Sequence, residues 1–384
     1  MRLGGGPKAM KVAAIGDAHL GRSYLPYVAE PGVNQRERDF EVSFEAAVEL
    51  ALSQEPDLVV WLGDIFDHPA PHYRSYRVAQ RALARIRDAG LPAVVISGNH
   101  DTPRLPGRGS PYSALADTFP EICFAHRLAY ERFEISAGGD RIVVHAVPQT
   151  MSVEATLEAL EQAAGSRSAE HTNLLLTHPR VKQVEPRHAD INEIEVDLGA
   201  LRSDLVLLGH YHFHAEVAER IWYAGSTDTF SFADDPDKPK GIVVLDTVNG
   251  SCRHLPLAGQ RPLVTLASVR ALGLSPAELA EQVLARAATV PAGAVARLYL
   301  EGVDPEAFRL LDRQAVREAA GAALHLDLQP EFQDLAVPAE LPSVETLGGQ
   351  WESWLTHQDL TGLDRARVRD LGHRYLQAAI EAAG

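Results

Sequence analysis

The chain has 384 residues, which at roughly 150 residues per domain predicts two domains and additional residues for a linker or an appendage. Hydrophobic residues make up 46% and charged residues 23%, so global disorder and low-complexity architectures are excluded. No run reaches the roughly 18 to 20 apolar residues of a membrane-spanning helix, and two cysteines, Cys123 and Cys252, are too few for a disulfide framework. We therefore expect a folded cytoplasmic protein without a membrane segment.

The net charge is -16, from 36 basic and 52 acidic residues. Such a charge repels polyanions at long range, which argues against unspecific coating of nucleic acid. A local basic groove or a metal site that meets phosphate directly stays compatible with this charge, because the carboxylate ligands of a metal site add to the acidic count.

From residue 11 onward, short apolar runs alternate with amphipathic stretches, a pattern typical of an α/β domain. Helices are expected at 35–53 and 75–89, the second ended by Gly90 and Pro92. The later strands lack long helices between them, which favours a mixed or antiparallel sheet, or two stacked sheets. The expected strands are 11–16, 58–62, 93–97, 141–146, 173–177, 205–208, 221–223 and 241–245.

The pattern changes near residues 259–262, which predicts a domain boundary. Beyond it, a βαβαβ order is expected, the default form of a small cap or substrate-guiding module. Its strands are expected at 263–266, 295–300 and 324–328, and its helices at 275–288 and 305–319. The expected organisation is a main domain at 1–259, a capping domain at 260–329, a linker at 330–345 and a helical segment at 346–384.

Two helices are expected in the last segment, at 351–357 and 364–382. Two interpretations of their apolar side chains stay open, because such a face packs against the chain's own domains or docks in a partner's groove. The candidate partner-binding residues are Trp351, Trp354, Leu355, Leu371 and Tyr375.

Acidic, amide and imidazole side chains follow five of the expected strands. The carboxyl ends of strands in α/β sheets are where ligands bind, so these side chains are expected to converge. Any one motif has an ordinary structural explanation, such as a turn in which Asn and Asp bond their own backbone. Five motifs in order at successive strand ends indicate one site.

The candidate ligands are carboxylates, imidazoles and one amide, without sulfur, a set that suits Mn²⁺, Fe²⁺ or Zn²⁺ and fits a structural zinc site poorly. They exceed the needs of one ion. If Asp64 bridges, two ions about 3.5 to 4 Å apart can share them, which suits hydrolysis of a phosphoester. The candidate ligands are Asp17, His19, Asp64, Asn99, His178, His210 and His212.

These residues resemble the calcineurin-like metallophosphoesterases, whose order D-x-H, GD-x-x-D, GNH(D/E), H and GH-x-H is matched here. Within that superfamily the chain is similar to the SbcD-type DNA double-strand-break nucleases. The narrower resemblance lies in DAHLGR at 17–22, GDIFD at 63–67, SGNHD at 97–101, LLGHYH ending at His212, and AGSTDTFSF at 224–232. It implies two stacked mixed β-sheets flanked by helices, with a small α+β capping domain and a C-terminal helical tail.

The resemblance also implies roles for individual residues. The first ion would be held by Asp17, His19, Asp64 and His212, and the second by Asp64, Asn99, His178 and His210. His100 would stabilise the transition state or act as a general acid, with Asp101 orienting it. Some archaeal relatives have a functional histidine where this chain has Asp67, followed by His68, so the roles of these two residues stay open.

The function implied by the resemblance is a Mn²⁺-dependent nuclease with 3' to 5' exonuclease activity on duplex DNA ends and single-strand endonuclease activity. It would work as a nucleoid-associated homodimer with an SbcC-type coiled-coil ATPase of the SMC class. Phe40 and Phe44 are a candidate dimer surface, although core packing explains them equally well. DNA contacts are expected from Arg22, Arg74, Arg77, Arg104 and Arg108.

Two alternatives stay open beside the nuclease. One is a metallophosphodiesterase or phosphatase that acts on small phosphoesters with the same metal site, although such a substrate needs neither a cap nor a helical tail. The other is a non-catalytic scaffold of the same fold, which the complete set of candidate ligands disfavours.

Overall fold

We describe the chain from a computed structural model that covers residues 9–23, 28–30, 32–137, 139–184, 193–235, 238–333, 344–356, 358 and 364–383. The chain divides into two units. The first consists of the chain up to Thr265 with Thr289–Arg297 and Ala320–Asp327, and the second consists of Leu266–Ala288, Leu298–Ala319 and the chain from Leu328. Most of the linker expected at 330–345 lies outside the described residues.

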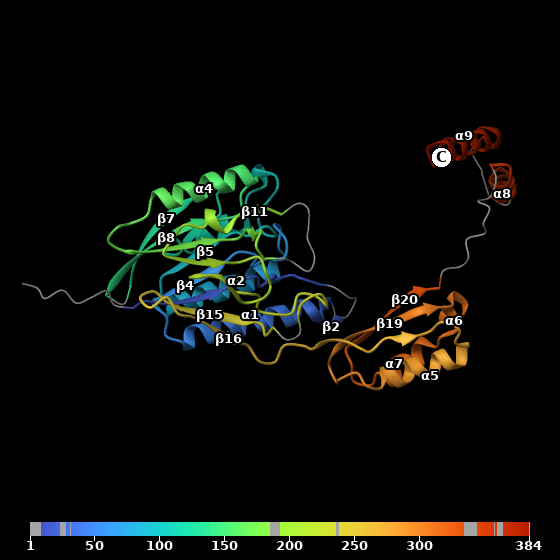
Figure 1. The fold of residues 1–384 in the computed structure, drawn as a ribbon, viewed down its shortest axis with the longest axis horizontal. Coiled ribbons are helices and arrows are strands. Elements are labelled where there is room, and N and C mark those ends of the chain that lie inside the picture. Colours follow the sequence, from blue (N-terminus) through green and yellow to red (C-terminus); the bar gives the residue numbers. More distant parts are fainter. Residues whose placement is uncertain are drawn as a thin grey trace, which may run out of the picture. The chain divides into compact units, whose positions relative to one another are not determined.

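The first unit contains two six-stranded mixed sheets (Figure 1). In the first sheet, with the order β16-β15-β1-β4-β5-β6, the last four strands are parallel and β15 and β16 are antiparallel. Its strands are β1 (Lys11–Ile15), β4 (Leu58–Leu62), β5 (Ala93–Ile96), β6 (Cys123–Ala125), β15 (Gly241–Asp246) and β16 (Cys252–Pro256). The parallel strands need crossover connections, and these are α1 (Gln35–Ser53), α2 (Tyr73–Asp88) and α3 (Pro111–Thr118).

The second sheet has the order β13-β14-β12-β9-β8-β7, with four parallel strands between two antiparallel edges. Its strands are β7 (Glu131–Ala137), β8 (Asp140–Val147), β9 (Thr172–Thr177), β12 (Leu205–Leu208), β13 (Ala215–Ala218) and β14 (Ile221–Tyr223). Short elements elsewhere in this unit are β2 (Val28–Glu30), β3 (Val33–Asn34), β10 (Arg180–Val181), β11 (Glu195–Val196), η1 (Pro106–Arg108) and η2 (Leu198–Ala200).

The two sheets share one apolar core between them. Successive residues of a strand point to opposite faces, so Val12 of β1 packs in the same cluster as Leu174 and Leu176 of β9, in the second sheet. The neighbouring Ala13 packs with Phe44 of α1 on the outer face. Strands buried on both faces are apolar throughout, and the prediction of two stacked mixed sheets flanked by helices is confirmed.

The expectation that the later strands lack long helices is wrong for one connection. Helix α4 (Val153–Gly165) joins β8 to β9 and lies over the outer face of the second sheet (Figure 1). The Ser152 side chain caps it by accepting a hydrogen bond from the Ala155 amide at 3.2 Å. Its buried face includes Ala159 and Ala163, and alanine is so common elsewhere in this chain that the helical period stood out poorly.

Helix α1 has the predicted bounds, and a side-chain cap stabilises its first turn. The Asn34 side chain accepts hydrogen bonds from the amides of Arg36 and Glu37 at 2.8 and 3.3 Å. Phe40 and Phe44, the candidate dimer surface, are both fully buried. They therefore belong to the core of the chain and offer no surface to a second copy.

A four-stranded sheet follows the first two, in which β17 and β18 run parallel to β19 and β20 also pairs with β19. The single helix expected at 305–319 is two helices, because Leu311 is extended and the Asp312 side chain caps a new start at the Gln314 amide. The elements are β17 (Leu263–Thr265), β18 (Val269–Arg270), α5 (Pro276–Ala287), β19 (Val295–Val303), α6 (Pro305–Leu310), α7 (Arg313–Ala319) and β20 (His325–Phe332).

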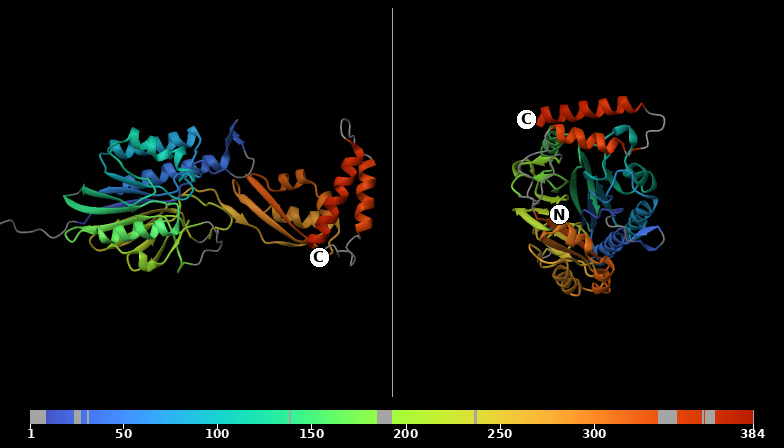
Figure 2. Two further views of the ribbon diagram at one scale, coloured as in Figure 1. Left: turned by 90° about the horizontal axis from the view of Figure 1, so that it is seen from above. Right: turned by 90° about the vertical axis from the view of Figure 1, so that its right-hand side faces the viewer.

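The last two helices, α8 (Val344–Thr356) and α9 (Arg365–Ala383), lie side by side (Figure 2). The Trp351 indole packs directly on Gly372, where any side chain would collide with it, and its Nε1 donates to the Arg369 carbonyl at 3.3 Å. Trp354 is 53% exposed and Tyr375 73%.

Among all helices in the described residues, none is long and apolar enough to cross a membrane.

Candidate metal centre

The five loops that carry the candidate ligands come from both sheets of the first unit. Three follow β1, β4 and β5 of the first sheet, and two follow β9 and β12 of the second. The structure brings all seven candidate ligands together in one cluster. Four of them are buried and Asn99, His210 and His212 are half-buried. The sequence predicted convergence at one sheet edge, whereas the cluster lies where the loop edges of two sheets meet.

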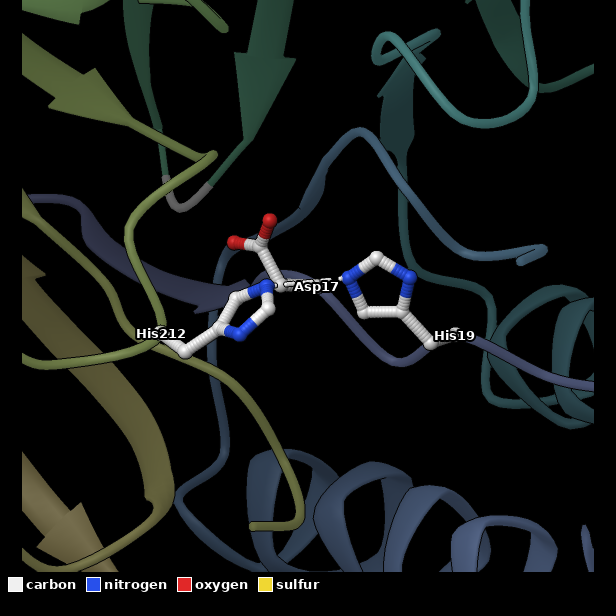
Figure 3. A group of neighbouring side chains, drawn as sticks. All are labelled: Asp17, His19 and His212. Carbon is white, nitrogen blue, oxygen red and sulfur yellow. Dashed lines mark hydrogen bonds between the residues drawn. The ribbon is translucent and has the colours of Figure 1, made fainter. Parts of the chain in front are cut away.

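One half of the cluster is formed by Asp17, His19 and His212 (Figure 3). The two imidazoles point toward each other, with their Nε2 atoms 3.0 Å apart. His19 Nε2 also lies 3.9 Å from Asp64 Oδ2. The ligand atoms of Asp17, His19 and His212 lie within 4.8 Å of one another, a spacing that one bound cation could span.

The other half contains Asp64, Asn99, His178 and His210. His178 Nε2 lies 3.2 Å from Asp64 Oδ2 and 3.1 Å from Asn99 Oδ1. His210 Nδ1 is also 3.1 Å from Asn99 Oδ1. Asp64 thus contacts both halves, and the geometry is compatible with the two ligand sets that the resemblance implies.

The donor set fits a pair of divalent cations, because imidazole nitrogens, carboxylate oxygens and one amide oxygen converge in the cluster. His178 Nδ1 lies 2.6 Å from the Leu62 carbonyl oxygen, which can only accept, so Nδ1 carries a proton. Nε2 is therefore the nitrogen directed at the oxygens of Asp64 and Asn99. In the neutral ring its lone pair would coordinate a cation bound beside these oxygens.

Burial favours the neutral form of most of these imidazoles. Burial lowers the pKa of His19 and of His210, and burial with the neighbouring His19 lowers that of His212 further. Burial would also lower the pKa of His178, but the Asp64 carboxylate opposes it and raises that pKa to about 10. Correspondingly, His178 overcomes the burial of Asp64 and holds its pKa below the ordinary value.

Unusual backbone conformations are concentrated in the cluster. Asp17, His19, Asp64 and His210 have φ angles of 47°, 46°, 49° and 100°, although none is glycine. Left-handed conformations of such residues cost free energy and gather at functional sites, where the surrounding structure enforces them. Here they direct four ligand side chains into one volume.

Two motif glycines are required by close packing. A Cβ atom at Gly98 would collide with the Asp64 carboxylate, and one at Gly209 would collide with the Leu62 carbonyl and the His178 ring. The glycines of GNH and GHYH therefore let the loops of different strands approach closely enough for their ligands to meet.

His100 and Asp67 lie together beside the ligands. The His100 amide donates to Asp64 Oδ1 at 2.8 Å, and its ring Nδ1 lies 3.2 Å from the Asp67 carbonyl and 3.6 Å from its carboxylate. The same carboxylate is 3.2 Å from His19 Nδ1. Asp67, whose role the sequence left open, thus contacts His19 and His100. His68 is exposed, and its Nδ1 accepts from the Ala70 amide within its own turn.

Asp101 does not have the contacts we expected. Instead of orienting the His100 ring, the buried Asp101 carboxylate accepts hydrogen bonds from the Gly98 amide at 2.8 Å, from the Ile65 amide at 2.9 Å and from the Tyr112 hydroxyl. Burial and the nearby Asp64 raise its pKa to about 7. Asp101 therefore ties the GNHD turn to the GDIFD loop, a structural role that turns containing Asp commonly show.

Of the five arginines expected to contact DNA, Arg22 lies against the cluster. Its Nη1 is 3.6 Å from Asp67 Oδ2, and its guanidinium carbon is 3.9 Å from the centre of the Phe230 ring. Arg74 pairs with the buried Glu41 carboxylate at 2.7 Å, which gives it a structural partner. The remaining three, Arg77, Arg104 and Arg108, are exposed.

Two residues of the cluster were not predicted. Glu193 Oε2 lies 3.2 Å from His210 Nε2, and nothing in the local sequence signals it. Phe230 packs on His19 and His212 with ring centres 4.6 and 4.4 Å apart. It lies in the AGSTDTFSF stretch that carries part of the resemblance, so the motif was noticed while its contact was not.

The fold and this ligand cluster define a class of proteins. The calcineurin-like phosphoesterase family matches residues 10–214, more than half of the chain, and the chain belongs to this family. The resemblance inferred from the five motifs is therefore confirmed at the level of the family.

Within this family, the chain is similar to proteins named for DNA double-strand break repair. The chain is 28% identical over 225 residues to the DNA double-strand break repair protein Mre11 of Saccharolobus solfataricus, covering 57% of this chain and 55% of that protein. It is 29% identical over 267 residues to Mre11 of Aeropyrum pernix, covering 66% and 59%. The chain thus spans a little over half the length of these relatives. Among solved structures, TT1561 of Thermus thermophilus is 16% identical with a TM-score of 0.39, covering 65% of this chain and 99% of that chain.

Proposed function

We propose that this protein is a Mn²⁺-dependent DNA nuclease subunit that processes DNA ends as a homodimer in the cytoplasm, with an SbcC-type coiled-coil ATPase. The expected activities are 3' to 5' exonuclease on duplex ends and endonuclease on single strands. The observation that carries the proposal is the cluster of seven candidate ligands, in which Asp64 contacts both halves. The similarity to proteins named DNA double-strand break repair protein Mre11 supports DNA as the substrate.

Each of the two ions would be held by its own set of residues. Asp17, His19 and His212 would hold one ion and Asn99, His178 and His210 the other, with Asp64 shared. Two divalent ions, when bound, would offset the charge that builds on the phosphoryl oxygens and lower the pKa of water. The oxygen and nitrogen donors, without sulfur, are compatible with Mn²⁺.

We propose that His100 acts on the substrate. Its side chain is 34% exposed, unlike the fully buried His19 and His178, so a phosphodiester could reach it. The Asp67 carbonyl lies at Nδ1 and can accept its proton, which leaves Nε2 as the atom available to the substrate. A protonated His100 would donate to the leaving oxygen, and the Asp67 carboxylate would support its positive charge.

Arg22 supplies a fixed positive charge beside His100. The Phe230 ring and the Asp67 carboxylate both hold the guanidinium, and the side chain remains 28% exposed. Guanidinium groups bind phosphate oxygens through several N–H donors. We propose that Arg22 contacts the backbone phosphate next to the scissile bond.

The α8–α9 pair is the proposed docking element for the ATPase. Trp351 holds the two helices together, whereas Trp354 and Tyr375 remain exposed. Exposed aromatic side chains on a helix pair fit the groove of a partner helix or coiled coil.

The decisive experiment compares substrates with purified protein and Mn²⁺. Duplex DNA labelled at the 3' or the 5' end, circular single-stranded DNA and a small chromogenic phosphodiester are incubated in parallel. We expect cleavage of both DNA substrates, with mononucleotide release from the 3' end. Efficient turnover of the small diester with intact DNA would instead identify a phosphodiesterase for small substrates, and inactivity on all substrates despite metal binding would identify a scaffold.

A further inference from the structure

The loop after β14 forms an aromatic wall of the metal centre. The Phe230 ring contacts both imidazoles of the closest ligand pair, with ring centres 4.6 Å from His19 and 4.4 Å from His212. The Phe230 ring therefore adds a packing contact to the hydrogen bonds that orient the two imidazoles. The two rings meet the phenyl group at interplanar angles of 59° and 51°, and the His19 and His212 Nε2 atoms stay 3.0 Å apart.

Buried polar groups fix the backbone before Phe230. The Asp228 carboxylate is fully buried and accepts from Arg36 Nη2 at 3.0 Å and from the Ser43 hydroxyl at 2.5 Å. Arg36 also donates to the Thr229 carbonyl at 2.9 Å. Arg36 and Ser43 lie on α1, so the helix that packs on the first sheet also holds this loop.

The backbone after Phe230 is held as well. The Phe230 amide donates to Asp234 Oδ2 at 2.9 Å, and Lys240 Nζ donates to the same oxygen at 2.7 Å. Lys240 Nζ donates in addition to the His212 carbonyl. Lys240 therefore holds both the backbone of Phe230, through Asp234, and the backbone of the candidate ligand His212.

A buried ion pair adds little net stability compared with well-packed apolar residues, but it can specify one geometry. We propose that Phe230 is a positioning residue of the metal centre: anchored through Asp228 and Arg36, its ring holds the His19 and His212 imidazoles with their Nε2 atoms directed at a common point. This inference rests on the proposed function only in taking the cluster to bind divalent cations.

The chain offers a matched control two residues further along. Phe232 is also half-buried, but its ring packs against the Arg297 guanidinium, 4.3 Å from the ring centre. Phe230→Leu and Phe232→Leu thus make the same chemical change in one segment, and the first alone removes the contact with the ligands. Asp228→Asn tests whether the buried carboxylate is needed to hold Phe230 in place. If that variant does not fold, Phe230→Leu still tests the inference, because Phe230 is only half-buried.

The test measures Mn²⁺ binding to full-length protein by isothermal titration calorimetry, the Tm of the metal-free protein, and DNA cleavage against Mn²⁺ concentration. Loss of a group that orients metal ligands weakens metal affinity by about 10- to 100-fold. We expect a loss of about 10-fold for Phe230→Leu and less than about 2-fold for Phe232→Leu. Cleavage by Phe230→Leu should recover at saturating Mn²⁺ and saturating DNA, because all seven ligands remain and a less firmly held Arg22 then affects DNA binding alone.

Equal Mn²⁺ affinity for Phe230→Leu and the wild-type protein would overturn the inference, as would equal losses in the two leucine variants. A lower turnover at saturating Mn²⁺ with unchanged affinity would overturn it too, since the ring would then act on the substrate through Arg22 and leave the metal ligands unaffected. The wild-type titration separates this inference from the proposed function. If the wild-type protein binds no Mn²⁺, both fail, whereas wild-type binding with unaffected Phe230→Leu removes the positioning role alone.

Discussion

The side chains proposed to act at the metal centre are mostly buried, whereas those proposed to act in the α8–α9 helix pair are exposed. At the centre, Asp17 and His19 are fully buried and each has a further contact, Asp17 with the His210 amide and His19 with Asp67. In the helix pair, Trp354 and Tyr375 remain more than half exposed. A buried centre with strained loops tolerates few changes and governs the chemistry. An exposed pair can change without disturbing that chemistry, so its substitution should affect association alone.

The largest effect is expected from removal of the shared ligand. Asp64→Ala should lower kcat by more than about 10³-fold, because both ions lose a ligand and the site loses several kcal/mol of charge stabilisation. His210→Ala should act in the same direction. The measurement is DNA cleavage with Mn²⁺ titration and a melting curve. Asp117→Ala, an exposed carboxylate on α3, is the matched control and should retain full activity. Near-normal turnover by Asp64→Ala would remove the two-ion assignment.

The second effect separates catalysis from metal binding within the centre. His100→Ala should keep Mn²⁺ affinity close to wild type and lower kcat by about 10²-fold, as for a positioned general acid. Calorimetry and single-turnover cleavage measure the two quantities. His68→Ala, an exposed histidine in the neighbouring loop, should leave both unchanged. If His100→Ala loses metal instead, His100 is a ligand and the role proposed for it is wrong.

A smaller effect is expected at the rim of the centre. Duplex binding by the isolated subunit should weaken with salt, at a slope of about -0.9 per phosphate contacted, and Arg22→Gln should reduce the slope by about one such contact. Arg132→Gln changes an arginine of β7 that pairs with Glu134 and should leave the slope unaltered. Binding assays between low and physiological salt give both slopes. A salt-independent affinity would count against phosphate contacts here.

The smallest effect on cleavage is expected from the helix pair. Deletion of the chain after Pro342 should leave Mn²⁺-dependent cleavage of single-stranded DNA within about 3-fold of wild type, because the tail supplies none of the metal ligands. The same deletion should abolish co-purification with the ATPase. Trp354→Ser with Tyr375→Ser should reproduce the loss of association with both helices intact. An insoluble or inactive truncated protein would show instead that the tail completes the chain's own core.

Much of the fold could be predicted because buried strands are short apolar runs and their ends carry turn residues. The first helix was placed at its observed bounds through its apolar face, and in the structure the Asn34 side chain caps its start. The helix at Val153–Gly165 was missed because half of its buried residues are alanine, which is common throughout the chain. One expected helix proved to be two, because Asp312 begins a new helix at a point where the apolar period continues.

The sequence by itself determined the identity of the seven candidate ligands, because each follows a strand end in a motif that can be recognised locally. It could not determine their partners. His19 and His212 are 193 positions apart, and the stacking of two sheets places their Nε2 atoms together. The same long-range packing assigned Asp67 to His19 and His100, turned Asp101 toward Tyr112, and brought Glu193 and Phe230 to the cluster. Tertiary structure decided these contacts because side chains from distant loops meet only once both sheets have packed.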